Sequence, residues 1–174
     1  SGAYDRAAAL FVPSFEAVRE RAPDYFDGLN ARTWLLAAQV HTAVGAYDEA
    51  SEALTRYLTQ MPLVTRRQPG NFEPPFGRRW EARGGVRERM ISDLRGEPSN
   101  RDLRFLLGYV WVCERAWVDA YLAFASLLEE FPDDEEEEES DSTGDRAGFV
   151  SPQREALVLE YLAWLNEEHD AAEG

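Results

Sequence analysis

The 174-residue sequence contains no lysine, because all 18 of its basic residues are arginine. A chain without lysine cannot form a lysine Schiff base with a carbonyl substrate, and it cannot supply the phosphate-binding lysine of a Walker loop. The sequence has a single cysteine, Cys113, so no disulfide can form within the chain. Its neighbours Val110, Trp111 and Val112 are apolar, which predicts a buried thiol that behaves as a small hydrophobic side chain.

Histidine is also scarce. His41 lies on the inner face of a predicted helix, and His169 lies in an acidic tail. Neither belongs to a spacing typical of a metal site, and acidic residues are so abundant that no catalytic carboxylate pair stands out. The sequence therefore predicts no metal and no cofactor, and it indicates that the protein is not an enzyme.

Long apolar runs are missing. The longest run, residues 106–113, is far shorter than the roughly 18 residues that a membrane helix needs. Residues 1–10 lack the basic start and apolar core of a signal peptide. We therefore expect a soluble protein with no membrane segment, and the cytoplasm is the favoured compartment.

Acidic residues outnumber basic ones by 33 to 18, which gives a net charge of −15 at pH 7. Such acidity keeps a protein surface hydrated and is typical of salt-adapted proteins. Residues 66–104 are the exception, because ten arginines stand against six acids and leave a local net charge of +4. Within residues 66–89 arginines alternate with aromatic residues, a pattern that can stack bases and contact phosphates. The candidate contacts with a polyanion or an acidic partner are Arg78, Arg79, Trp80 and Arg83.

Residues 34–62 have the pattern of two helices joined by a tight turn. Gly45 provides a residue that tolerates a left-handed turn, and Pro62 ends the second helix. The small residues Ala38 and Ala50 allow the two helices to approach closely. The predicted inner positions are Trp34, Ala37, Ala38, His41 and Val44 in the first helix, and Tyr47, Ala50, Leu54, Tyr57 and Leu58 in the second.

The same pattern returns 70 residues later and ends at Pro132. Arg104 stands at the position of Trp34, and Arg115 at the position of the turn glycine, where a non-glycine residue carries a steric cost. The equivalent inner positions are Leu107, Gly108, Trp111, Trp117, Ala120, Phe124, Leu127 and Leu128.

Both segments resemble tetratricopeptide (TPR) repeats, whose period is about 34 residues. The resemblance implies an all-α fold of TPR-like helix-turn-helix repeats in a short right-handed superhelix. We expect this domain over residues 1–134, with regular repeats at 31–64 and 101–134. The separation of two periods predicts an irregular repeat at 67–100, whose first half is rich in proline and glycine.

Residues 1–30 predict a partial repeat, because residues 2–7 echo residues 45–50. The chain is then either a fragment of a longer protein or begins with an unpaired capping helix. Pro13 is expected to kink this helix or to end it near Val12.

The C-terminal part of the sequence predicts a linker and one more helix. Residues 133–150 begin with the acidic run 133–139 and have little apolar content, which predicts a disordered linker. Residues 151–170 predict a helix that begins with Ser151 as N-cap and Pro152 in the first turn, and that runs to about Glu168. We expect it to cap the last repeat, with docking on a partner as the alternative. Its apolar stripe consists of Leu157, Tyr161, Leu162 and Leu165.

The TPR resemblance implies a protein–protein interaction scaffold, in which the first helices of the repeats line a concave groove for a peptide or partner segment. One alternative is that residues 66–89 bind nucleic acid or an acidic partner, although the net negative charge of the chain disfavours nucleic acid. The other alternative is an enzyme of unrecognised type. The sequence leaves the oligomeric state open. The residues assigned to partner binding are Arg32, Leu35, Gln39 and Thr42 in one repeat, and Asp102, Phe105, Tyr109 and Val112 in the other.

Overall fold

The computed structural model describes residues 2–62, 85–129 and 152–173. This part of the chain is all-helical and contains no strand, as predicted. None of its helices combines the length and the apolar composition of a membrane-spanning segment. The eight helices of the described residues are α1 (Gly2–Arg21), α2 (Pro23–Asp27), α3 (Ala31–Val44), α4 (Tyr47–Gln60), α7 (Val86–Gly96), α8 (Arg101–Glu114), α9 (Trp117–Glu129) and α10 (Pro152–Glu173).

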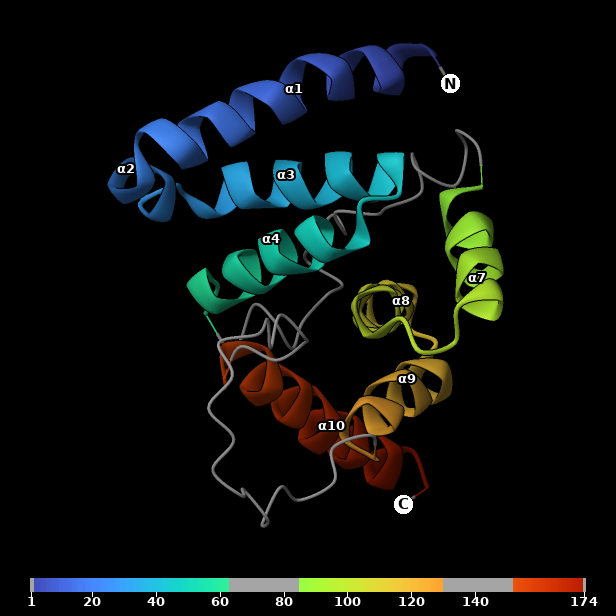
Figure 1. Cartoon of the computed structure of the whole chain (residues 1–174). Coiled ribbons are helices and arrows are strands. Elements are labelled where there is room, and N and C mark those ends of the chain that lie inside the picture. The colour runs from blue at the N-terminus through green and yellow to red at the C-terminus, as the bar shows by residue number, and fades with distance from the viewer. Residues whose placement is uncertain (1, 63–84, 130–151, 174) are drawn as a thin grey trace, which may run out of the picture.

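Two helix pairs, α3 with α4 and α8 with α9, form the centre of the molecule (Figure 1). Each pair is joined by the same tight turn. Gly45 has φ 83°, and the N–H of Ala46 donates to the carbonyl of His41. Arg115 has φ 60°, and the N–H of Ala116 donates to the carbonyl of Trp111. Both turns are therefore Schellman motifs, and in the second one an arginine occupies the left-handed position that favours glycine.

The starts of α3 and α8 are also equivalent. The side chain of Asn30 accepts a hydrogen bond from the N–H of Thr33 at 3.1 Å, and that of Asn100 accepts one from the N–H of Leu103 at 2.9 Å. Asparagine at this position satisfies a backbone donor that has no partner inside the helix. The two caps are 70 residues apart, so the repeat frame extends to the residue before each first helix.

The two pairs pack directly against each other through α4 and α8, while α7 packs beside α8 (Figure 1). Of the irregular repeat predicted at 67–100, the structure describes only α7 and the residues that follow it. Residues 67–84 lie outside the described part of the chain, as does the whole of the predicted linker 133–150. No helix of the described residues separates α4 from α8.

Helix α1 packs along α3 and continues without interruption through Pro13 to Arg21, so the prediction that it ends near Val12 is wrong. Side chains on both sides of Pro13 bind the helix to α3. The ring of Phe11 packs edge-on against His41 with centroids 6.4 Å apart, and that of Phe15 packs against Trp34 at 5.6 Å. This packing offsets the hydrogen bond that proline cannot donate inside a helix.

The core contains most of the predicted inner positions. Trp34, Ala38 and Leu54 are fully buried in the first pair, and Gly108 and Phe124 in the second. Val44, which the pattern placed on the inner face of α3, is instead exposed, because it is the last residue of the helix. Glycine at position 108 is required by space, since a Cβ there would lie 2.7 Å from Cε1 of Phe124.

Candidate functional site

Helix α10 lies across three other helices, α4, α8 and α9 (Figure 1). It begins at Pro152, as predicted, and continues to Glu173, beyond the predicted end near Glu168. We call the side chains that receive it the α10-binding face. They are Thr55 on α4, Asp102, Phe105 and Tyr109 on α8, and Trp117 and Phe124 on α9.

The first turn of α10 is held by polar contacts around Arg154. Its Nη1 donates to Oδ1 of Asp102 at 2.7 Å, and its Nε donates to the hydroxyl of Thr55 at 3.0 Å. The same oxygen of Asp102 accepts a hydrogen bond from the hydroxyl of Ser51. The guanidinium also lies over the ring of Phe105, 5.3 Å from its centroid.

Arg154 is only 7% exposed, so its charge is almost fully removed from water. A buried arginine is tolerated when its donors and its charge are matched, and the contacts with Asp102, Thr55 and Phe105 provide this matching. Because such contacts are directional, they fix the position of α10 along the face more strictly than apolar packing alone would.

The later turns of α10 are held by aromatic contacts. Tyr161 stacks on Phe124 with centroids 5.4 Å apart and meets Tyr109 edge-on at 6.3 Å. Trp164 meets Trp117 edge-on at 5.4 Å. Offset-stacked and edge-to-face pairs of this kind add about 0.5–1.5 kcal/mol each to the burial of the rings. The face therefore has a polar end at Arg154 and an aromatic end at Trp164.

The structure brings three of the predicted partner-binding residues together at this face, namely Asp102, Phe105 and Tyr109. The expectation that they line an open groove is wrong, because Phe105 is 0% and Tyr109 is 5% exposed. α10 occupies the space in front of them, and Val112 is also 0% exposed within the core.

The four predicted residues on α3 do not share one environment. Arg32 is exposed, and Leu35 and Gln39 are partly buried, with Leu35 packed against the core. Thr42 is fully buried, and its hydroxyl donates to the carbonyl of Ala38 at 2.7 Å. The prediction that Thr42 faces a groove is therefore wrong, because its hydroxyl is used within its own helix.

Sequence reasoning placed Leu157, Tyr161 and Leu165 on the α10 side of this contact, where they are buried, but it missed Arg154 and Trp164. Their signal was present, because Arg154 precedes Leu157 by three residues and therefore lies on the same helical stripe. A basic residue on an otherwise apolar stripe indicates a specific buried partner. The predicted stripe also included Leu162, which is only partly buried.

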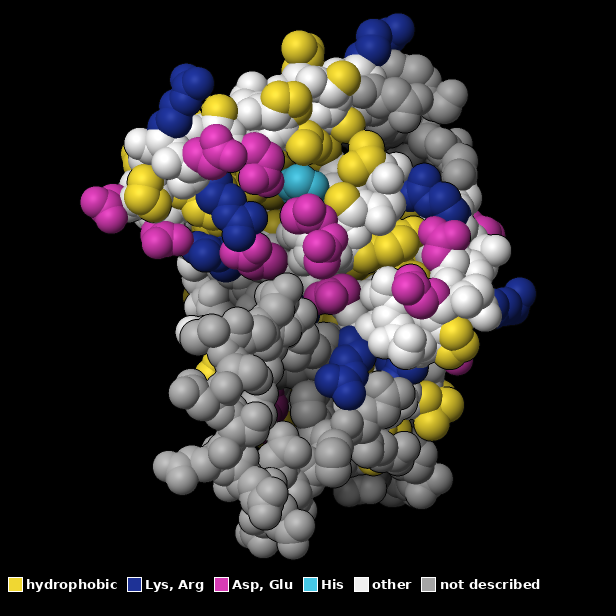
Figure 2. All heavy atoms as spheres, viewed as in Figure 1, with side chains coloured by type: hydrophobic (Ala, Val, Ile, Leu, Met, Phe, Trp, Pro, Cys, Tyr) yellow, Lys and Arg dark blue, Asp and Glu magenta, His cyan; other side chains and the backbone are white. Residues whose placement is uncertain are grey.

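His41 is 2% exposed, and neither ring nitrogen has a hydrogen-bond partner among the described residues. Burial lowers the pKa of this histidine, and the carboxylates of Glu16, Asp48 and Glu52 oppose the shift. Figure 2 shows acidic side chains gathered beside the histidine on this face of the molecule. His41 is thus a buried, neutral core residue, as the sequence indicated.

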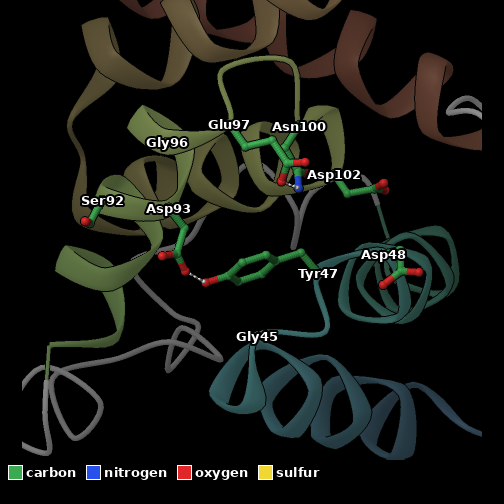
Figure 3. A pocket seen from close by; sticks show the side chains of 9 residues that line it. All are labelled: Gly45, Tyr47, Asp48, Ser92, Asp93, Gly96, Glu97, Asn100 and Asp102. Carbon is green, nitrogen blue, oxygen red and sulfur yellow. Dashed lines mark hydrogen bonds between the residues drawn. The ribbon is translucent and has the colours of Figure 1, made fainter.

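A cavity of about 490 Å³ lies where the start of α4 meets α7 and the start of α8 (Figure 3). Its charged lining is acidic, but the carboxylates already accept hydrogen bonds from the chain itself. Asp93 accepts from the hydroxyl of Tyr47 at 2.5 Å, and Glu97 accepts from the side chain of Asn100 at 3.1 Å. The lining residues are Gly45, Tyr47, Asp48, Ser92, Asp93, Gly96, Glu97, Asn100 and Asp102.

This cavity is best explained by the packing of α7. Burial, together with the hydrogen bond to Asp93, raises the pKa of Tyr47 to about 12, so the hydroxyl remains a hydrogen-bond donor at neutral pH. The part of the chain that the structure describes contains no cluster of His, Cys, Asp and Glu that could hold a metal ion. Cys113 is partly buried and packs against the core, and burial of its thiol raises the pKa to about 12, which supports the interpretation of this cysteine as a small hydrophobic side chain.

The arginine-rich stretch is described only from residue 85 onward, so Arg78, Arg79, Trp80 and Arg83 lie outside the described residues. Two of its other arginines make contacts within the molecule. Arg87 forms an ion pair with Glu114 at 2.7 Å, and Arg89 donates to the carbonyl of Thr42 at 2.8 Å, at the end of α3. A cation at a helix C-terminus is favourable, so Arg89 serves to bind α7 to the first helix pair.

Comparisons of this chain with protein-family models, with curated proteins and with solved structures find no match.

Proposed function

We propose that this chain is a protein–protein interaction scaffold built on TPR-like helix pairs, and that the α10-binding face is its recognition surface. The observation that carries the proposal is the way α10 is held. Six side chains from three helices converge on one helix, with a buried ion pair at one end and aromatic pairs at the other. A surface that binds a helix from its own chain has the chemistry to bind a helical segment of a partner.

The arrangement of the helix pairs supports the finer part of the proposal, a short TPR-like superhelix. Two pairs with equivalent caps and equivalent turns, packed against each other through α4 and α8, are the elements from which such a superhelix is built. We propose binding in preference to catalysis, because the Asp102 carboxylate, which accepts the hydrogen bond of the Ser51 hydroxyl, is also paired with Arg154, and the rest of the face is filled by aromatic contacts.

The test is to select binding peptides from a random library on the immobilised chain and to map where they bind. Titration of each selected peptide into ¹⁵N-labelled protein should shift amide signals of α4, α8 and α9 around Thr55, Asp102 and Phe124. Shifts confined to the acidic cavity between α4 and α7 would contradict the proposed surface. Tight binding of single-stranded nucleic acid that weakens steeply with salt would favour the arginine-rich stretch instead.

A further inference from the structure

The contact stripe of α10 continues along most of the helix. Arg154, Leu157, Val158, Tyr161, Trp164 and Leu165 are all buried, while Leu159 on the opposite side is 49% exposed. Their spacing of three and four residues forms a single stripe, like that of a helical peptide in a groove. The recognition chemistry is thus an arginine one turn ahead of Leu157 and Val158, followed by a tyrosine and a tryptophan.

The connection of α10 to the rest of the fold differs from that of a helix within a repeat. The helices within each pair are joined by two residues, 45–46 and 115–116, whereas residues 130–151 separate α9 from α10. Helix–helix connections in bundles are commonly about 2–8 residues long. α10 also contacts α4, which precedes it by about ninety residues in the chain. It therefore contacts helices that are distant from it in the sequence, as a helix from another chain would.

Arg154 is the second unusual feature. A helix that only covers apolar surface gains more from a hydrophobic side chain than from a buried ion pair. A buried arginine, in contrast, specifies orientation and recovers its hydration when the helix leaves.

We infer that α10 is an exchangeable internal ligand, which occupies the α10-binding face until a partner protein displaces it with a helix of the same chemistry. This inference rests on the proposed function. Because α10 belongs to the same chain as the face, its local concentration there is high, on the order of millimolar. A competing helix must overcome this local concentration, so the intact chain binds partners more weakly than the bare face would.

The test uses the complete chain with a site-specific protease sequence placed within residues 133–150. A fluorescent synthetic helix of residues 152–173 is titrated into the protein before and after cleavage, without removal of the cut segment. Cleavage should tighten binding of the synthetic helix at least 10-fold, because the local concentration of the competing α10 is lost. The synthetic helix carrying Arg154→Glu should bind at least 10-fold more weakly than the original, whereas the Leu159→Ala helix, changed on the exposed side, should bind equally well.

Hydrogen exchange distinguishes release of α10 from unfolding of the whole molecule. Uptake of the labelled helix should be faster than exchange of the buried amides of α3, which α10 does not need to expose. Uptake that occurs only at the rate of α3 exchange would make α10 a permanent part of the fold and would overturn the inference. Equal binding before and after cleavage, or by the Arg154→Glu helix, would overturn it as well.

Two further outcomes identify which proposal has failed. If the synthetic helix never exchanges but library peptides still bind at the face, the inference about α10 is wrong and the proposed function stands. If library peptides bind the face neither before nor after cleavage, the proposed function itself is wrong. A dimer of the intact chain that exchanges α10 between two copies would replace the separate partner by a second copy and would overturn the inference in its stated form.

Discussion

At the scale of single residues, the two helix pairs fill equivalent positions at the helix crossing with different side chains. Ala38 and Leu54 in the first pair correspond to Gly108 and Phe124 in the second, and all four are buried. The larger ring of Phe124 is accommodated because its neighbour has no side chain. The total volume at the crossing of the helices is therefore conserved while each residue changes.

Gly108→Ala should lower the free energy of unfolding by about 1–3 kcal/mol, because the added methyl group meets the ring of Phe124. Gly96→Ala is the matched control, since no atom lies within 4 Å of the added Cβ there. The double variant with Phe124→Leu, which recreates the alanine and leucine of the first pair, should recover part of the loss. Urea denaturation measures the free energy of unfolding of all three variants. If Gly108→Ala left this free energy unchanged, the helix crossing would be looser than described.

The burial of His41 predicts a pH dependence of stability. Burial lowers its pKa in the folded protein below the value of about 6.5 expected in the unfolded chain. As the pH falls through that value the unfolded chain takes up a proton that the folded chain resists, so His41 destabilises the fold progressively in acid. The contribution of a single group changes by at most about 1.4 kcal/mol per pH unit, and it is constant above neutral pH.

The measurement compares unfolding of the wild type and His41→Phe between pH 8 and pH 5. The comparison is necessary because Glu49 acts in the opposite direction. Its side-chain hydrogen bond with Asp48, together with burial, raises its pKa to about 7, so protonation of Glu49 stabilises the fold as the pH falls. The difference between the two proteins isolates His41 and should grow below pH 6.5; a difference that is independent of pH would contradict the prediction.

At the scale of elements, the turn between α8 and α9 carries a cost that the turn between α3 and α4 avoids. Arg115→Gly should raise the free energy of unfolding by about 0.5–1 kcal/mol, because glycine adopts φ 60° without strain. Gly45→Ala should lower it by about 1 kcal/mol for the converse reason. Arg115→Ala is the control, because it removes the charged side chain but keeps the Cβ. If Arg115→Ala stabilised as much as Arg115→Gly, the side chain and not the backbone would be responsible.

Helix α1 offers a second test at this scale. Pro13 leaves the carbonyl four residues before it without its helical donor, so Pro13→Ala should stabilise the protein by about 1–3 kcal/mol. The neighbouring exposed residue Ser14, whose hydroxyl bonds the carbonyl of Leu10, provides the control Ser14→Ala with little effect. Thermal unfolding measures both. An unchanged melting temperature for Pro13→Ala would indicate that α1 separates from α3 before the rest of the protein unfolds.

At the scale of the whole molecule, the excess of acidic residues should make stability depend on salt. With a net charge of −15 the compact state is opposed by repulsion among its own carboxylates, and added salt screens this repulsion within a distance of about 10 Å at 0.1 M. The melting temperature should therefore rise between low salt and about 0.2 M NaCl. A fall over this range would mean that surface ion pairs such as Arg56 with Asp27 stabilise the fold more than the net charge destabilises it.

The sequence was sufficient to predict the helix pairs because each pair has its own helical periodicity, and the first pair also has a turn glycine, Gly45, and a proline, Pro62, just after its second helix. It was insufficient to predict how distant elements meet. A spacing of 70 residues suggested that a further repeat lies between the two pairs. Spacing in the sequence does not determine which helices are neighbours in space, and α4 packs directly against α8. The burial of Phe105 and Tyr109 depends on α10, whose local pattern defines its apolar stripe but contains no information about the helices that it covers.

The contact between Trp117 and Trp164 also has a spectroscopic consequence. Two indole rings with centroids 5.4 Å apart at an angle of 81° are close enough for their excited states to couple, which gives a paired positive and negative band in the far-ultraviolet circular dichroism spectrum. One ring lies on α9 and the other on α10, so the band should vanish when α10 leaves its face. The fluorescence of Trp34, which lies on α3 and is buried against α1, should not change at that moment. The protein therefore contains its own optical reporter for the position of α10 and needs no added label.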